Sequence, residues 1–323
     1  MKRLLPTFLS AILCATTLWC AADTPSSANG FAATFPSRIA LASSLRDSAE
    51  FALSALEYRR IAADLEPGDP AIPSLHLAAA DAYRLQKRWD RMGKMLDAAD
   101  DAASASGVLQ GGASSSPATR SFADALLFLR LRCAEGLQDW TSAAYYAEDL
   151  AANCAPATCA PAVQTADIAS WASRAAAANH LRAGDEAAAR AAAANDQATC
   201  AAIDRYASGH DKSPRIGGFL GIVPGLGYAY SGEWGNMFRS IFLNGIFGWA
   251  MFECADHERW GLFAITTFFE FTWYTGSIYG GIDAAHRYNK NRLNEAANAI
   301  IDGPAPQLRQ DPAIAFFSLR LAF

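Results

Sequence analysis

The feature that most constrains this chain is the loss of charge after Arg215. Three runs with almost no charged residue follow it, at Ile216–Gly232, Ser240–Phe252 and Trp260–Ile282. The last run is long enough to cross a bilayer, the first is marginal, and the second is short unless Arg239 extends toward lipid headgroups. A buried soluble core is the alternative. Aromatic residues near the ends of the runs favour a membrane module over residues 214–292; they are Tyr228, Tyr230, Trp234, Trp260 and Tyr279.

Small residues repeat at helical spacing within these runs. Glycines recur four residues apart at Gly217, Gly221 and Gly225, and again at Gly276 and Gly280. Such faces allow helices to approach closely in lipid. Pro224 should kink or break the first segment, so we expect a bent or re-entrant element ahead of a helical hairpin.

The same region resembles a known family. The segments PGLGYAYSGEWG, FLNGIF and WYTGSIYGGIDAAHRYN are similar to a bacterial family of small membrane modules akin to the two-transmembrane-helix domain family. The family signature Pro-Gly-x-Gly-x-x-Tyr-x-Gly is matched here by Pro224, Gly225, Gly227, Tyr230 and Gly232. The closing segment includes Gly276, Gly280, His286 and Asn289, and Tyr228 replaces a glutamine that is usual in the family. The resemblance covers about a quarter of the chain and implies a membrane hairpin, but no settled activity.

One charge lies near the middle of the longest apolar run, at Glu270. A charge at such a position is costly and marks a function or a partner. If the run is the antiparallel mate of the preceding helix, Glu270 lies at about the depth of Asn244. We therefore predict a hydrogen bond between Asn244 and Glu270 that joins the two helices, in preference to a proton path.

The N-terminus reads MKRLLPTFLSAILCATTLWCAAD. Two basic residues, an apolar segment and small residues at a cleavage site predict a secretory signal peptide over residues 1–22, followed by a linker over 23–35. A lipoprotein signal acylated at Cys20 and an uncleaved anchor are the alternatives. Each of the three exports the domain that follows.

Export would place four cysteines in an oxidising compartment. Cys154 and Cys159 flank the turn NCAPATCAP and are near enough for a local bridge, which leaves Cys133 to pair with Cys200. Three connectivities remain open. No histidine lies at ligand spacing from the close pair, so we expect no metal site.

Residues 36–210 show a degenerate helical repeat. In LAAADAYRLQKRWDRMGKMLDAADDA, the small and aromatic positions of one helix precede the buried face of a second. These positions are Ala79, Ala80 and Tyr83, then Trp89, Met92, Leu96 and Ala99. The pattern resembles a tetratricopeptide repeat, and weaker copies bring the expected number of units to four. A plain helical bundle is the alternative. The resemblance implies a concave face that binds a protein or peptide.

The tail, residues 293–323, contains a linker, DGPAPQLRQDP, and ends in AIAFFSLRLAF. The alternating apolar residues of this end predict a terminal β-strand that docks on the sheet edge of a partner; a disordered end is the alternative.

The sequence carries no catalytic motif: a phosphate loop, HExxH and GxSxG are all absent. Asp283 and His286 are spaced as an exposed charge pair. The net charge of −5 gives no reason to expect nucleic acid. We expect a non-enzymatic protein without cofactors.

We therefore predict an all-α chain, with tetratricopeptide-like repeats followed by a small helical transmembrane module. Its place is a bacterial cell envelope, with the repeats in the periplasm and the module in the inner rather than the outer membrane. The expected partners are membrane lipid, an envelope protein or peptide, and other copies of the chain. The predicted function is a membrane-anchored adaptor, with an envelope-assembly factor as its more specific form. The alternative is a transporter or channel subunit that uses Glu270.

Overall fold

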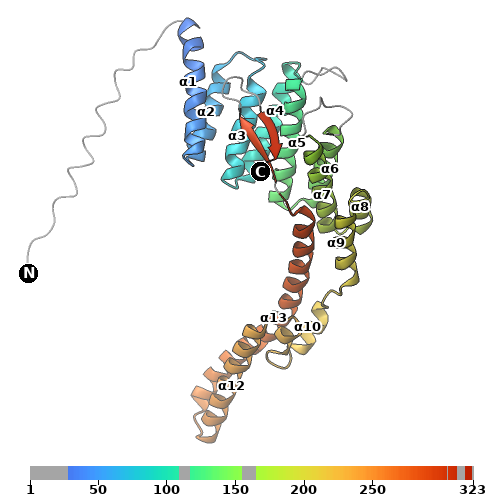
Figure 1. The fold of residues 1–323 in the computed structure, drawn as a ribbon. Coiled ribbons are helices and arrows are strands. Elements are labelled where there is room, and N and C mark those ends of the chain that lie inside the picture. Colours follow the sequence, from blue (N-terminus) through green and yellow to red (C-terminus); the bar gives the residue numbers. More distant parts are fainter. Residues whose placement is uncertain (1–27, 109–116, 155–164, 304, 311–316, 322–323) are drawn as a thin grey trace, which may run out of the picture.

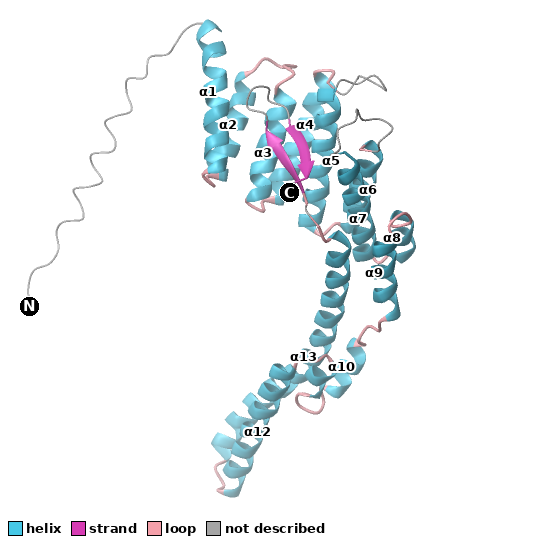
Figure 2. Ribbon diagram, viewed as in Figure 1, coloured by secondary structure: helices cyan, strands magenta, loops and turns pink. Residues whose placement is uncertain are grey.

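The computed structural model describes residues 28–108, 117–154, 165–303, 305–310 and 317–321. The predicted signal peptide and Cys159 lie outside the described residues. The described part of the chain forms thirteen helices and one small β-hairpin, which confirms the all-α prediction apart from that hairpin (Figure 2).

The first nine helices form a stack in which α1 to α8 each pack mainly on their neighbours in the chain, whereas α9 packs mainly on α13 (Figure 1). They are α1 (Ala28–Asp47), α2 (Phe51–Asp64), α3 (Ile72–Leu85), α4 (Trp89–Ala105), α5 (Pro117–Leu137), α6 (Trp140–Asn153), α7 (Thr165–Ala183), α8 (Glu186–Ala192) and α9 (Gln197–Ser208). Four consecutive pairs, α1/α2 to α7/α8, lie where the four repeat units are predicted. Helix α1 begins at Ala28, inside the segment predicted to be a linker.

Small residues let the helices of this stack pack closely. Ala79, Ala80 and Ala99 are completely buried, together with Met92. Trp171 of α7 is also fully buried and packs against Phe128 of α5. These predicted core positions of the repeat unit formed by α3 and α4 therefore do lie in a core.

The stack continues into a second, elongated part of the molecule. It consists of α10 (Pro214–Leu220), α11 (Leu226–Tyr230), α12 (Trp234–Asp256) and α13 (Trp260–Ile301). With 42 residues, α13 is roughly 63 Å long. Its first half pairs with α12, and its second half packs on α7 and α9 of the stack (Figure 1).

The end of α13 shares a small core with the stack. Ala297 and Ile300 of α13 are buried against Leu181 of α7 and Ile203 of α9. Arg292 adds a hydrogen bond of 2.8 Å to the carbonyl oxygen of Tyr206. One unbroken helix thus joins the apolar hairpin to the helical stack.

The tail folds back on the chain itself. Strand β1 (Pro306–Gln310) pairs antiparallel with β2 (Phe317–Leu321), with Leu308 opposite Leu319. The prediction of a terminal strand is confirmed for β2, which pairs with β1 of the same chain; docking on the sheet edge of a partner stays a prediction. Part of the predicted linker is therefore strand, because Leu308 is buried in the core of the stack and holds β1 there.

Candidate functional site

The outer surface of α12 and of the first half of α13 is apolar. Phe242 and Trp249 of α12 are 67% and 71% exposed, and Phe268 of α13 is 68% exposed. Further exposed apolar side chains extend this surface along both helices and onto α10; they include Phe219, Phe238, Ile241, Ile246, Phe252, Leu262, Ile265 and Phe271. Of the helices in the described ranges, none combines enough length with enough apolar character to cross a membrane.

The first apolar run does not form one helix. It is divided into α10 and α11 by a turn that contains Pro224 and Gly225. Gly225 has φ of +89°, a conformation that a side chain disfavours, and begins α11. Gly232 ends α11 with φ of +80° and turns the chain into α12. The predicted bend is therefore confirmed, and the signature glycines Gly225 and Gly232 each permit a turn.

The two short helices pack on α13 through glycine. A Cβ atom on Gly227 would lie 2.5 Å from the backbone oxygen of Gly217 and 2.7 Å from Cα of Gly281. Gly280 is covered by the ring of Tyr228. The predicted pairing of Gly276 with Gly280 as one packing face is wrong: Gly276 has open space beside it, and Gly281 makes the close backbone contact instead.

Polar contacts tie the bend to α13 on the side near the stack. The side chain of Asn289 both donates to and accepts from the backbone of Lys212, at 2.9 and 2.7 Å. The hydroxyl of Tyr230 accepts a hydrogen bond from the backbone nitrogen of Ser213. Tyr230 and Asn289 therefore hold the short segment, Lys212 and Ser213, that connects the stack to the hairpin.

An ion pair closes the same end of the hairpin. Arg287 of α13 donates two hydrogen bonds of 2.8 Å to the carboxylate of Glu233, which precedes α12. These hydrogen bonds lower the pKa of Glu233 below its ordinary value, and a hydrogen bond from Asn236 contributes in the same direction. Asp283 also pairs with Arg287, so the expected pair between Asp283 and the exposed His286 does not form.

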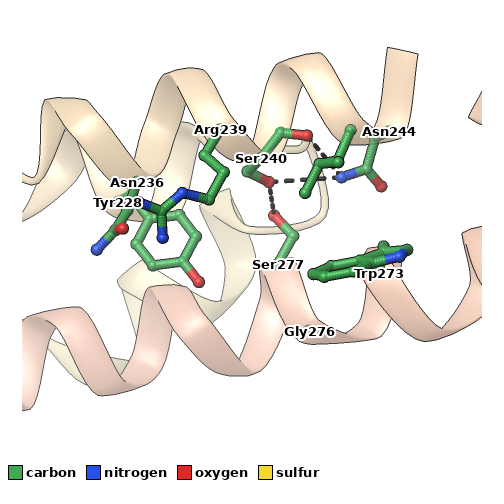
Figure 3. A pocket seen from close by; sticks show the side chains of 9 residues that line it. Tyr228, Asn236, Arg239, Ser240, Asn244, Trp273, Gly276 and Ser277 are labelled. Carbon is green, nitrogen blue, oxygen red and sulfur yellow. Dashed lines mark hydrogen bonds between the residues drawn. The ribbon is translucent and has the colours of Figure 1, made fainter. Parts of the chain in front are cut away.

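A cavity of about 200 Å³ lies between α11, α12 and α13 (Figure 3). At its centre, the hydroxyl of Ser277 accepts hydrogen bonds from the backbone nitrogen of Gly225 and the hydroxyl of Ser240, each 3.1 Å long. Asn244 donates a hydrogen bond of 2.7 Å to the carbonyl oxygen of Ser240. Tyr228, Arg239 and Trp273 also line the cavity. A polar space is thus enclosed by a hairpin whose outside is apolar.

The predicted hydrogen bond between Asn244 and Glu270 is wrong. The two hydroxyls of Ser240 and Ser277 meet, and the rings of Phe247 and Phe269 stack at 6.2 Å. This register places Asn244 level with Trp273, which lines the same cavity, and nearly one helical turn from Glu270. One oxygen of Glu270 is buried and has no partner among the described residues.

The predicted bridge between Cys133 and Cys200 is also wrong. Both are free thiols: Cys133 lies in the main core of the stack and contacts the carbonyl oxygen of Trp89. Cys200 lies against the second core, where its thiol contacts the carbonyl oxygen of Ala193. Cys154 is buried, and its predicted mate Cys159 lies outside the described residues, so that pairing stays a prediction.

The tail covers one face of the stack. Strand β2 contacts α5 and α7, which are the first helices of two successive pairs. Figure 1 shows the β-hairpin lying across the stack near α3, α4 and α5. The chain thus places its own extended segment on the side of the stack lined by first helices.

Sequence reasoning missed Arg239, Ser240 and Ser277 as cavity residues. A signal was present, because Ser240 and Asn244 are four residues apart and share one helix face inside an apolar run. Ser277 offers no comparable signal, since only the register of the hairpin brings it opposite Ser240.

Neither a protein-family model, nor a curated protein, nor a solved structure matches this chain. The site is therefore defined by its geometry.

Proposed function

We propose that this chain is a membrane-anchored adaptor of the bacterial cell envelope. In this proposal the hairpin of α12 and α13 is embedded in lipid, and the helical stack is a set of tetratricopeptide-like repeats that binds a partner protein or peptide in the periplasm. The observation that carries the proposal is the exposed apolar surface of the hairpin. An exposed apolar surface of this extent is a typical mark of a membrane or protein contact.

The dimensions of the hairpin support a lipid environment. Helix α12 has 23 residues and is roughly 35 Å long, close to the thickness of about 30 Å of a bilayer's hydrocarbon core. Trp234 and Tyr279 are exposed at one end of the hairpin, and Trp249 and Trp260 are exposed toward the other. Aromatic side chains at two levels fit the two interfaces of a membrane.

The division of the first apolar run changes the expected topology. Because α10 and α11 are short and pack on α13, both ends of the hairpin return to the side of the stack. In this proposal the chain therefore passes the membrane twice, through α12 and the first half of α13. The basic residues Lys212, Arg215 and Lys290 lie at this end, whereas a cytoplasmic position is usual for such residues. Labelling of Cys254, near the other end of α12, with a membrane-impermeant maleimide decides which side the tip occupies.

Membrane fractionation of the full-length chain, with alkaline carbonate extraction, tests the anchor. We expect the chain in the carbonate-resistant pellet. The double variant Phe242→Asp/Phe268→Asp should move into the supernatant, because a charge on a lipid-facing helix costs roughly 2.5–3.5 kcal/mol at the bilayer centre. Leu53→Asp, a matched change of an exposed residue on α2, should leave the chain in the pellet. A wild-type chain found entirely in the soluble fraction contradicts the proposal.

In vivo crosslinking tests the adaptor role. Since β1 and β2 cover the side lined by α5 and α7, Leu308→Asp should release the tail and increase crosslinking of a partner to that side. Gln307→Asp, on the same strand but exposed, is the matched control and should change nothing. Equal crosslinking in all three proteins, or none, contradicts a binding role for this face.

A transporter or channel subunit is the second candidate function. The buried, unpartnered oxygen of Glu270 favours it, because such a group calls for a partner that a second copy of the chain could supply. Ion flux into vesicles that contain the full-length chain, abolished by Glu270→Gln while carbonate resistance is kept, would support this role over the adaptor.

A further inference from the structure

A pocket of about 170 Å³ lies between two successive helix pairs of the stack, α3/α4 and α5/α6. Its inner wall is apolar, because Leu96 of α4 and Cys133 and Ala134 of α5 line it and are buried. Leu137 also lines the pocket and is 53% exposed, so the pocket opens to the surface of the stack. An apolar cavity of roughly 150 Å³ can hold a benzene molecule, so one aliphatic side chain fits this pocket.

The pocket exists because α4 contains a glycine. Gly93 lies in the interior of α4, where glycine costs roughly 1 kcal/mol relative to alanine. Its φ is not positive, and a Cβ there would meet Sγ of Cys133 at 3.8 Å, an ordinary contact. Gly136 of α5 differs, because a Cβ there would overlap the ring of Trp89. Packing therefore requires Gly136 but not Gly93, and what the missing side chain of Gly93 provides is the open space of the pocket.

The charged residues at the pocket are mostly acidic. Asp97 lines it from α4, and Asp139 lines it from the residue that precedes α6. The pKa of Asp139 is lowered by two hydrogen bonds from Ser142, so this carboxylate stays charged. Arg130 also lines the pocket, but its guanidinium lies 2.6 Å from Asp100 and 3.8 Å from Asp97. Asp100 thus holds the arginine, and the carboxylate of Asp97 is 74% exposed.

The thiol on the inner wall reports the sign of the local potential. Burial raises the pKa of Cys133, and the charges of Asp97 and Asp90 raise it further. Arg130 lowers that pKa, but by less than either carboxylate raises it. The pocket therefore lies at a negative potential, which favours a cationic partner.

We propose that this pocket binds a leucine or methionine side chain of a partner protein, flanked in the partner by lysine or arginine residues that pair with Asp97 and Asp139. The apolar wall takes the aliphatic side chain, and the two carboxylates select basic neighbours over acidic ones. This inference deepens the proposed adaptor role by naming the chemistry of a partner. The contact lies between α4, α5 and α6, whereas the tail contacts α5 and α7.

Fluorescence anisotropy of a labelled peptide, titrated with the detergent-solubilised full-length chain, tests the pocket. The probe is the peptide Ser-Lys-Leu-Lys-Ser, and we expect it to bind. The peptides Ser-Lys-Ser-Lys-Ser and Ser-Glu-Leu-Glu-Ser should bind at least about tenfold more weakly. The first loses the burial of an aliphatic side chain, and the second places like charges together.

Variants of α4 locate the binding. Gly93→Leu should fill the pocket and weaken binding of the probe at least about tenfold, while stability to denaturant stays equal or rises, since leucine favours a helix more than glycine does. Asp97→Asn should weaken binding about twofold to fivefold, as expected for an exposed charge pair. Ala105→Leu and Asp101→Asn are the matched controls, at exposed positions of α4 that do not line the pocket, and should bind like the wild type.

Each outcome decides the proposal. Weaker binding in the two test variants alone supports the pocket. Equal binding of the three peptides, no binding of the probe, or a Gly93→Leu variant that binds like the wild type overturns it. Because the titration uses no membrane and leaves the tail unchanged, a failed carbonate extraction or tail-release experiment would count against the adaptor role and not against this pocket.

Discussion

The helical stack and the apolar hairpin distribute the same kinds of side chain in opposite ways. In the stack, Trp171 and Phe128 are buried and alanines fill the contacts between helices. In the hairpin, Phe242 and Trp249 face outward, while Ser277 and Asn244 are buried. Since apolar groups leave water, the difference teaches that the stack covers its own apolar side chains, whereas those of the hairpin are left for another surface to cover, which we propose is lipid.

The largest expected difference in stability between the two regions comes from replacing one tryptophan in each. Trp171→Ala should destabilise the stack by about 3–5 kcal/mol, because it empties a fully buried site. Trp249→Ala, at an exposed site, should leave the free energy of unfolding in detergent almost unchanged. Chemical denaturation followed by circular dichroism measures both. Equal losses would show that the hairpin is packed as the stack is.

Replacing a glycine of the module that contains the hairpin should have a smaller effect on stability. Gly281→Ala should destabilise the module by about 1–3 kcal/mol, because its Cβ would overlap the backbone of Gly217. Gly248→Ala, in open space on α12, should stabilise the helix by up to about 1 kcal/mol. Thermal denaturation in detergent separates the two. A neutral Gly281→Ala would contradict the close contact between α10 and α13.

Replacing Asn244 should raise the stability of the chain, whereas replacing Trp171 or Gly281 should lower it. Asn244→Leu removes a buried acceptor without a partner among the described residues, so we expect the chain to gain about 1 kcal/mol of stability. Thermal melts in detergent measure this gain, and a variant less stable than the wild type would mean that Asn244 is structural.

The smallest effect is a pH dependence at Glu233. Its pKa is lowered in the folded chain by Arg287, so the unfolded chain binds more protons as the pH falls toward the ordinary value of 4.5. The stabilisation is therefore complete above that value and is lost as the pH falls through the folded pKa. It should amount to less than about 1 kcal/mol, since the pair is partly exposed. Arg287→Gln should flatten the pH profile of the melting temperature, and an unchanged profile would refute this contribution.

The sequence predicted the structural features that depend on residues close to one another in the chain, such as helix faces and turns. Met92, Leu96 and Ala99 of α4 are buried because their spacing of four and three residues puts them on one face of the helix. The bend at Pro224 and Gly225 follows from the backbone restrictions of proline and the freedom of glycine.

Contacts between distant segments were predicted less well. Asn244 misses Glu270 because two serines set the register of the hairpin, and spacing does not reveal that. Cys133 and Cys200 belong to different cores, which a count of cysteines does not show. Strand β1 contains one leucine, Leu308, and no isoleucine or valine, so its pattern is too weak to stand out.

Because α13 passes from the hairpin into the stack without a break, its two ends cannot turn independently. If the hairpin tilts to match a thinner or thicker membrane, the stack must swing through the same angle, at the end of a lever roughly 63 Å long. Bilayer thickness would then set how far from the lipid surface, and in which direction, the stack holds whatever it binds.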